Sequence, residues 1–68
     1  MHLRILTQRE KQVFDLLISN YSTKEIAAML GISDKTVRNH ISNVMLKLGV
    51  KGRAQAVVEL LRLHEIHI

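Results

Sequence analysis

The chain has 68 residues, the length of one small domain, which leaves no room for a second catalytic or sensory domain. It has no cysteine, which excludes disulfides and thiolate metal sites, and its 47% of apolar residues argue against intrinsic disorder. No apolar run approaches the ~20 residues of a membrane span, and the N-terminus lacks the pattern of a cleaved signal peptide. We therefore expect a folded, cytoplasmic domain with no membrane partner.

The positive charge lies in the middle of the chain. Ten Lys and Arg residues against six Asp and Glu residues give a net charge of +4. Residues 33–53 hold five of the basic side chains and only one acidic side chain, Asp34, so this stretch accounts for the whole excess. A local excess of positive charge favours a polyanionic partner.

Capping residues and glycines divide the chain into four predicted helices. The residues suited to begin helices are Thr7 with Glu10, Ser22 with Glu25, and Ser33 followed by Asp34. The glycines that separate the apolar-periodic segments are Gly31, Gly49 and Gly52. There is no proline and no strand-like alternation. We predict a single all-α domain over residues 1–68, with helices at about 7–20, 23–30, 34–48 and 53–65.

Each of the first three predicted helices has one apolar stripe at helical spacing. The stripe residues are Val13, Phe14, Leu17, Ile18 and Tyr21 in the first helix, Ile26, Ala27, Met29 and Leu30 in the second, and Val37, Ile41, Val44 and Leu48 in the third. The side chains that project away from the third stripe are Lys35, Arg38, Asn39, Ser42 and Leu46. The third helix therefore has a polar and basic outer side.

The fourth predicted helix is apolar on two sides. The residues predicted to face the core are Ala54, Val57, Val58 and Leu61. On the roughly opposite side lie Ala56, Leu60 and Leu63. Because a four-helix monomer has nothing to cover a second apolar side, we predict that these three residues form the interface of a homodimer. The alternative is that Leu60 and Leu63 contact the first helix of the same chain.

Two helices joined by the tight joint Gly31-Ile32-Ser33, the second with a basic outer side, are typical of a helix-turn-helix unit. An α-helix fits the ~12 Å wide major groove of DNA. There Arg38 can donate two hydrogen bonds to guanine and Asn39 can pair with adenine, while Ser42 suits several bases. The basic residues better placed to neutralise phosphates are Lys24, Lys35, Lys47, Lys51 and Arg53.

Five segments of the chain carry a resemblance to a known family. They are Leu6-Thr7-Gln8-Arg9-Glu10 with Val13, Lys24-Glu25-Ile26-Ala27, Ile32-Ser33-Asp34-Lys35-Thr36-Val37-Arg38-Asn39-His40-Ile41, Lys47-Leu48-Gly49-Val50 and Arg53-Ala54-Gln55-Ala56-Val57. With these segments nearly the whole chain resembles the LuxR-type DNA-binding domain. The run from Lys35 to Val58 is most similar to a stand-alone member that regulates transcription during sporulation.

The resemblance implies a four-helix domain of the winged-helix-like superfamily without a wing. Its third helix would enter the major groove, and its fourth would form a two-fold dimer. By position, the resemblance implies that Arg38, Asn39 and Ser42 face the bases. The residues that it places near phosphates are Lys24, Ser33, Lys35, Thr36, His40 and Lys47. It also implies that Glu10 makes a structural bond inside the domain.

We predict a homodimeric, sequence-specific regulator of transcription that binds double-stranded DNA in the major groove and is associated with the nucleoid. RNA polymerase is a candidate further partner. No cofactor and no small-molecule ligand is expected. Because no sensory domain is present, we expect the amount of the protein to set its activity.

Other functions fit the sequence less well. An enzyme is disfavoured because the chain has no nucleophile elbow, phosphate loop or paired carboxylates. A helical protein-interaction module, such as an adaptor or an antitoxin, is the alternative function, with an incidental basic side. A metal site at His64, Glu65 and His67 is disfavoured because no further carboxylate or histidine is placed to complete a set of three or four ligands.

Overall fold

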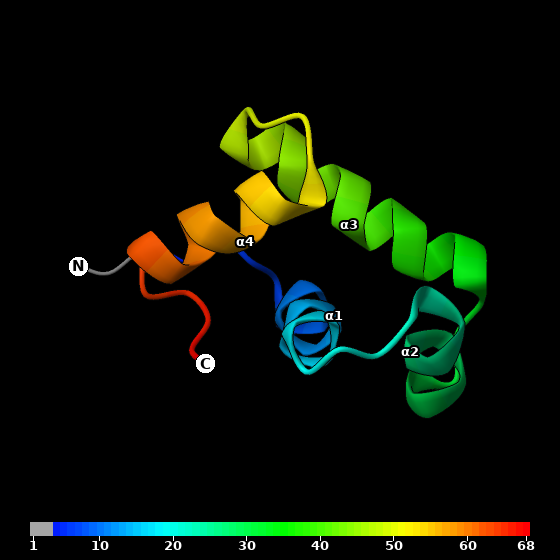
Figure 1. The fold of residues 1–68 in the computed structure, drawn as a ribbon. Coiled ribbons are helices and arrows are strands. Elements are labelled where there is room, and N and C mark those ends of the chain that lie inside the picture. The colour runs from blue at the N-terminus through cyan, green and yellow to red at the C-terminus, as the bar shows by residue number, and fades with distance from the viewer. Residues whose placement is uncertain (1–3) are drawn as a thin grey trace.

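Four helices make up residues 4–68, the part of the chain that the computed structural model describes: α1 (Gln8–Ile18), α2 (Thr23–Leu30), α3 (Asp34–Leu48) and α4 (Arg53–Arg62). Residues 1–3 of the predicted domain lie outside the described part. α1 lies near the centre with the other helices around it (Figure 1), and α3 contacts each of the other three. The predicted all-α, four-helix architecture is confirmed. Within residues 4–68, no helix is long and apolar enough to cross a membrane.

The predicted caps begin the first three helices. At α1, the Thr7 hydroxyl accepts a hydrogen bond from the Glu10 backbone N–H at 3.1 Å, and the Glu10 carboxylate accepts one from the Thr7 N–H at 2.9 Å. Ser22 and Glu25 form the same capping box at α2. Ser33 caps α3. Local sequence therefore sets where these helices start.

Two helices end earlier than predicted, each close to a residue with positive φ. α1 ends at Ile18 rather than at residue 20, because Asn20 has a φ of 73° and turns the chain out of the helix. α4 ends at Arg62 rather than at residue 65, because His64 has a φ of 58°. Asparagine and histidine adopt this left-handed conformation more readily than most non-glycine residues. The prediction relied on glycine to mark helix ends and so extended both helices too far.

The core is formed by one side of each helix together with both ends of the described chain. Its buried apolar residues are Leu6, Val13, Phe14, Ile26, Ala27, Val37, Ile41, Val44, Ala56, Leu60 and Ile66. Of the predicted α3 stripe, Val37, Ile41 and Val44 are buried and Leu48 is half-buried. Tyr21 and Met29, predicted in the stripes of the first two helices, are 39% and 53% exposed. Tyr21 lies beyond the early end of α1, and Met29 is next to the buried side of α2 but not on it.

The prediction for the two apolar sides of α4 was right for Val57 and Leu61, which pack partly buried against the core, and wrong for the residues that are most buried. Ala56 and Leu60 are completely buried within the domain, so they cannot form a dimer interface. Val58, predicted in the core, is 56% exposed, and Ala54 is also exposed. Both sides have the same helical spacing, so the sequence period does not determine which side turns inward. Packing of α4 onto α3 selects the side with Ala56 and Leu60.

Candidate nucleic-acid interface

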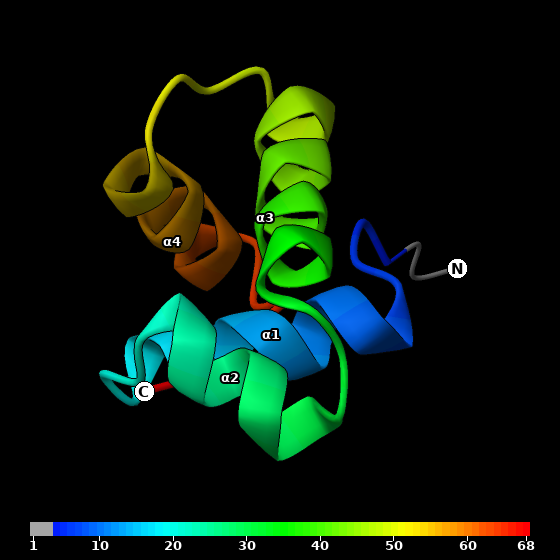
Figure 2. The same cartoon turned by 90° about the vertical axis from the view of Figure 1, so that its right-hand side faces the viewer.

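α2 and α3 form the predicted helix-turn-helix unit. In the joint between them, Gly31 has a φ of 67°, a left-handed conformation that glycine adopts without strain. The Ile32 backbone N–H donates to the Ala27 carbonyl at 3.0 Å and closes the turn. In Figure 2, α2 lies in front of α1, and α3 stands above both with its N-terminal end toward them. α3 therefore packs against the rest of the domain with one side, the side that carries Val37, Ile41 and Val44.

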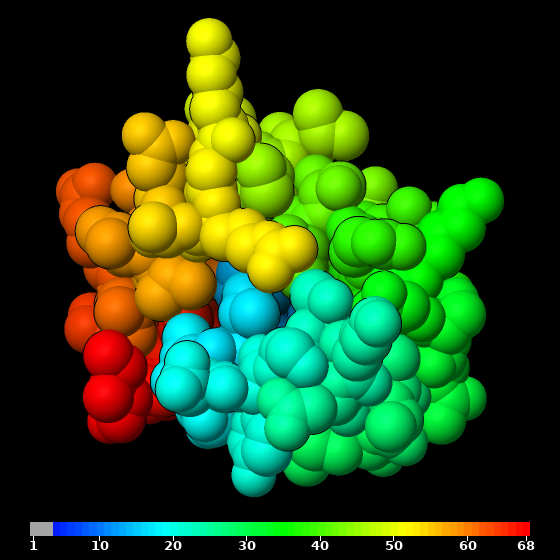
Figure 3. Space-filling view, turned by 45° about the vertical axis from the view of Figure 1, so that its right-hand side comes forward, coloured from blue at the N-terminus to red at the C-terminus, as the bar shows by residue number. Residues whose placement is uncertain are grey.

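The opposite side of α3, which we refer to as its outer face, consists of Lys35, Arg38, Asn39, Ser42, Asn43 and Leu46, all of them exposed. In Figure 3 the side chains of α3, green to yellow-green, stand out along the right-hand side of the molecule. The Arg38 side chain is 58% exposed and lies 3.8 Å from the Asp34 carboxylate, one turn earlier. Exposed ion pairs of this kind contribute little to folding. Arg38 therefore remains available to a ligand.

The N-terminal end of α3 carries the predicted phosphate-binding hydroxyl groups. The Ser33 hydroxyl accepts a hydrogen bond from the Thr36 N–H at 3.0 Å, and the two hydroxyl oxygens lie 2.8 Å apart. Ser33 is exposed, whereas Thr36 and His40 are half-buried. Lys24 is exposed near the start of α2. An anion at this end of α3 would meet free backbone N–H groups and the positive end of the helix dipole.

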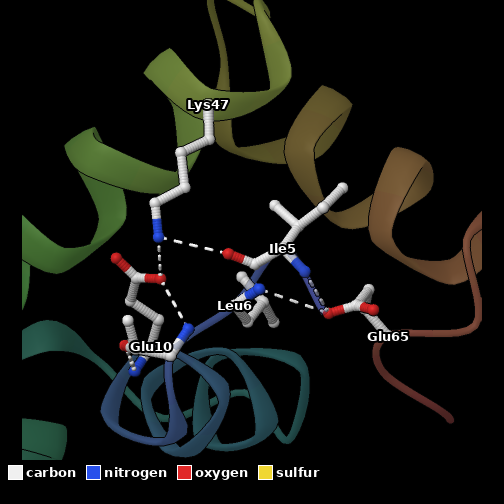
Figure 4. A network of polar contacts seen from close by, with 6 residues as sticks. Ile5, Leu6, Glu10, Lys47 and Glu65 are labelled. Carbon is white, nitrogen blue, oxygen red and sulfur yellow. Dashed lines mark hydrogen bonds and ion pairs between the residues drawn. The ribbon is translucent and has the colours of Figure 1, made fainter. Parts of the chain in front are cut away.

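Lys47, predicted to contact phosphate, is held by the domain itself (Figure 4). Its ammonium nitrogen lies 2.5 Å from a Glu10 carboxylate oxygen and 3.2 Å from the Ile5 carbonyl oxygen. The Glu10 side chain is only 5% exposed. The charge of Lys47 is therefore neutralised within the chain. The structural bond expected of Glu10 is confirmed, and its partner is Lys47.

Glu65, near the C-terminus, binds the segment before α1 that Lys47 also contacts at Ile5. Its buried carboxylate accepts hydrogen bonds from the backbone N–H groups of Ile5 and Leu6 at 3.2 and 3.3 Å. We refer to Ile5, Thr7, Glu10, Lys47 and Glu65 together as the Glu10 clamp. The Glu65 carboxylate thus binds backbone N–H groups. Among residues 4–68, no group of three or more His, Cys, Asp or Glu side chains is placed to hold a metal ion.

The clamp changes the protonation of Glu10. Burial alone would raise the pKa of this carboxyl group, because the charged form loses hydration. The hydrogen bonds from Lys47 and from the Thr7 N–H, together with the charge of Lys47, outweigh burial and hold the pKa of Glu10 below its usual value. Glu10 is therefore ionised at neutral pH and keeps its hold on Lys47.

Two residues of the site had no predicted role in binding, although Leu46 was already predicted on the outer side of the third helix. Asn43 and Leu46 both lie on the outer face, and Leu46 is 80% exposed. Helical spacing was a sufficient signal for both, because it places them opposite the buried stripe. The role of Lys47 had no such signal, because its partner Glu10 is 37 residues away in the sequence.

Comparison with known proteins gives the family. A family model described as bacterial regulatory proteins, luxR family, and named GerE, matches residues 4–60. The chain belongs to the luxR family. It is 66% identical over 64 residues to the spore germination protein GerE of Bacillus subtilis strain 168, covering 94% of this chain and 86% of that protein. A solved structure of the transcription factor GerE matches it with a TM-score of 0.92 and 58% identity, covering 96% of this chain and 97% of that one.

The chain also matches part of larger regulators. The chain is 51% identical to the transcriptional regulatory protein DegU of Brevibacillus brevis, covering 84% of this chain but 24% of DegU. It is 44% identical to the response regulator VraR of Staphylococcus aureus strain NCTC 8325, covering 79% of this chain and 26% of VraR. The chain is thus a GerE-like helix-turn-helix DNA-binding domain of a transcription regulator, as predicted. Regulators of this kind are not enzymes.

Proposed function

We propose that the protein is a sequence-specific, homodimeric regulator that binds double-stranded DNA and controls transcription during sporulation. The observation that carries this proposal is the outer face of α3, where cationic and hydrogen-bonding side chains are exposed along one helix. The role in sporulation is supported by the 66% identity to a spore germination protein. Its proposed place of action is the nucleoid, in the cytoplasm, with RNA polymerase as the partner through which it changes transcription.

The outer face has the size and chemistry to read bases in the major groove. An α-helix with its side chains is about 10–12 Å across, close to the width of the groove. Arg38 presents an exposed guanidinium that can donate two hydrogen bonds to guanine, and the adjacent Asn39 can pair with adenine. Ser42, one turn further along α3, can bond to several bases. We propose these three as the base-reading residues.

The proposed phosphate contacts surround the N-terminal half of α3. They are Lys24, Ser33, Lys35, Thr36 and His40. Hydroxyl groups, cations and a helix N-terminus are the groups that commonly position a protein on the phosphate backbone. We leave the predicted Lys47 out of this set, because its ammonium is already bound to Glu10 and to the Ile5 carbonyl, although its side chain is 36% exposed.

The exposed apolar side of α4 is the proposed dimer surface. A shallow hollow there is lined by Gly49, Val50, Lys51, Ala54, Gln55, Val58 and Glu59. Its lining is mostly apolar but includes Lys51 and Glu59, which are opposite in charge. Two copies of α4 packed antiparallel about a two-fold axis would bring Lys51 of each chain near Glu59 of the other. Such a dimer presents two α3 helices to half-sites about one turn of DNA, ~34 Å, apart.

A salt titration of the affinity for duplex DNA tests the proposed function. A preferred site is first selected from random duplexes. Logarithmic affinity should then fall linearly with logarithmic salt concentration, with a slope of about −0.9 per neutralised phosphate. Equal affinity for selected and random DNA would remove sequence specificity from the proposal. Negligible affinity for any duplex would instead favour a helical protein-interaction module.

Sedimentation tests the dimer surface. Val58→Asp places a charge in the lining of the hollow and should convert dimers to monomers, because a buried unpaired charge is costly. Leu63→Asp is the matched control: Leu63 is 39% exposed but does not line the hollow, so this variant should remain dimeric. If Leu63→Asp formed monomers and Val58→Asp remained dimeric, the interface would lie at Leu63, at the C-terminal end of α4, and not at the hollow.

A further inference from the structure

Leu46 is an apolar side chain in the middle of an otherwise polar surface. It is 80% exposed, more than any other large apolar side chain in residues 4–67. Exposed leucines that stand alone are common on proteins and need no explanation. Leu46 differs because its neighbours on the outer face of α3 are the residues proposed to read bases.

Helix geometry points Leu46 in the same direction as these residues. Seven residues are close to two turns of helix, so Leu46 projects within about 20° of the direction of Asn39. It follows Ser42 by one turn, or about 6 Å along the helix axis. At about 3.4 Å per base pair, this distance corresponds to roughly two base pairs. With α3 in the groove, Leu46 faces bases about two steps beyond those that Ser42 meets.

The major groove offers one apolar group to such a side chain, the 5-methyl group of thymine. The other groups on the base edges are hydrogen-bond donors and acceptors, and a leucine that covered them would deprive them of water. We propose that Leu46 contacts a thymine methyl group and thereby selects thymine at one position of the binding site. This inference rests on the proposed function, because it requires α3 to lie in the major groove.

Deoxyuridine, which lacks only the methyl group of thymine, tests this contact directly. Each thymine of the selected site is replaced singly by deoxyuridine, and affinity is measured for the wild type and for Leu46→Ala. Burial of one methyl group corresponds to about a fourfold change in affinity. We expect one position where the replacement weakens wild-type binding about fourfold and leaves Leu46→Ala binding unchanged. Met29→Ala, which shortens another exposed apolar side chain on a different helix, should respond like the wild type.

The outcomes separate this inference from the proposed function. Specific binding by the wild type that tolerates deoxyuridine at every thymine would overturn the methyl contact and leave the proposed function standing. A fourfold loss that persists in Leu46→Ala would assign the methyl contact to another residue and would also overturn the inference. Failure of the wild type to bind any duplex would overturn both.

Discussion

The outer face of α3 and the Glu10 clamp share one helix but use positive charge in opposite ways. On the outer face, the Arg38 side chain is 58% exposed and lies 3.8 Å from Asp34. In the clamp, the Lys47 ammonium lies 2.5 Å from a carboxylate oxygen of the buried Glu10. Arg38 is therefore available to a partner, whereas Lys47 is engaged in holding the fold together.

From this contrast we expect that a cation on α3 does not by itself mark a contact with DNA. A cation adds to DNA binding when it is exposed and no buried carboxylate neutralises it. By this criterion Lys35 belongs with Arg38, and Lys47 belongs with Glu10. Substitutions that separate folding from binding can test the distinction.

Removal of the carboxylate of the clamp should have the largest effect. Glu10→Ala leaves the Lys47 ammonium and the Thr7 N–H without their acceptor. Because the Lys47 side chain is 36% exposed, the loss should lower the free energy of unfolding by about 2 kcal/mol. Glu25→Ala is the matched control, because Glu25 forms the same capping box with Ser22 but on the surface. It should cost about 1 kcal/mol. Denaturant titrations followed by circular dichroism compare the two, and equal losses would mean that Lys47 adds nothing.

Arg38→Ala should affect binding and leave folding alone. Loss of a two-hydrogen-bond contact to guanine costs about 1–3 kcal/mol of binding free energy on the preferred site and relaxes the preference at one base position. The free energy of unfolding should change by less than about 0.5 kcal/mol, because the side chain is on the surface. Fluorescence anisotropy on the preferred site and on its single-base variants measures the first effect. An equal loss on random DNA would assign Arg38 to the phosphates.

Lys35 and Lys47 provide the finer comparison. Lys35→Ala should weaken binding to all sequences alike and reduce the salt slope by about one. Lys47→Met keeps the apolar stem and removes the charge, so it should lower the free energy of unfolding and leave the slope unchanged. Salt titrations of the two variants measure the slope, and thermal unfolding measures their stability. A slope reduced by about one in Lys47→Met would restore Lys47 to the phosphate contacts.

Much of the fold could be predicted because its signals are local. Thr7, Ser22 and Ser33 begin their helices through bonds to residues three positions ahead, and such spacing is visible in the sequence. Helix ends were less predictable, because Asn20 and His64 adopt a conformation for which glycine is the usual signal. The general principle is that a motif contained within one helical turn can be read directly.

The outer face of α3 was predictable and the orientation of α4 was not. α3 has one apolar stripe, so burial of that stripe determines the opposite side. α4 has two apolar sides, and the choice of Leu60 over Val58 for the core depends on its packing against the rest of the domain. The clamp likewise depends on segments 37 and 60 residues apart in the sequence, which only the folded chain brings together.

The smallest expected effect is a dependence of stability on acid pH that arises from the clamp alone. The pKa of Glu10 is lower in the folded chain than its usual value of about 4.3, so its charge stabilises the fold fully above that pH. This contribution is lost as the pH falls through the folded pKa. The difference in free energy of unfolding between the wild type and Glu10→Gln should therefore be constant above about pH 5 and shrink below about pH 4. Arg38→Ala, outside the clamp, should keep the wild-type profile. A difference that persisted unchanged to about pH 3 would mean that the charge of Glu10 does not hold Lys47, and the contrast with the outer face would lose its electrostatic basis.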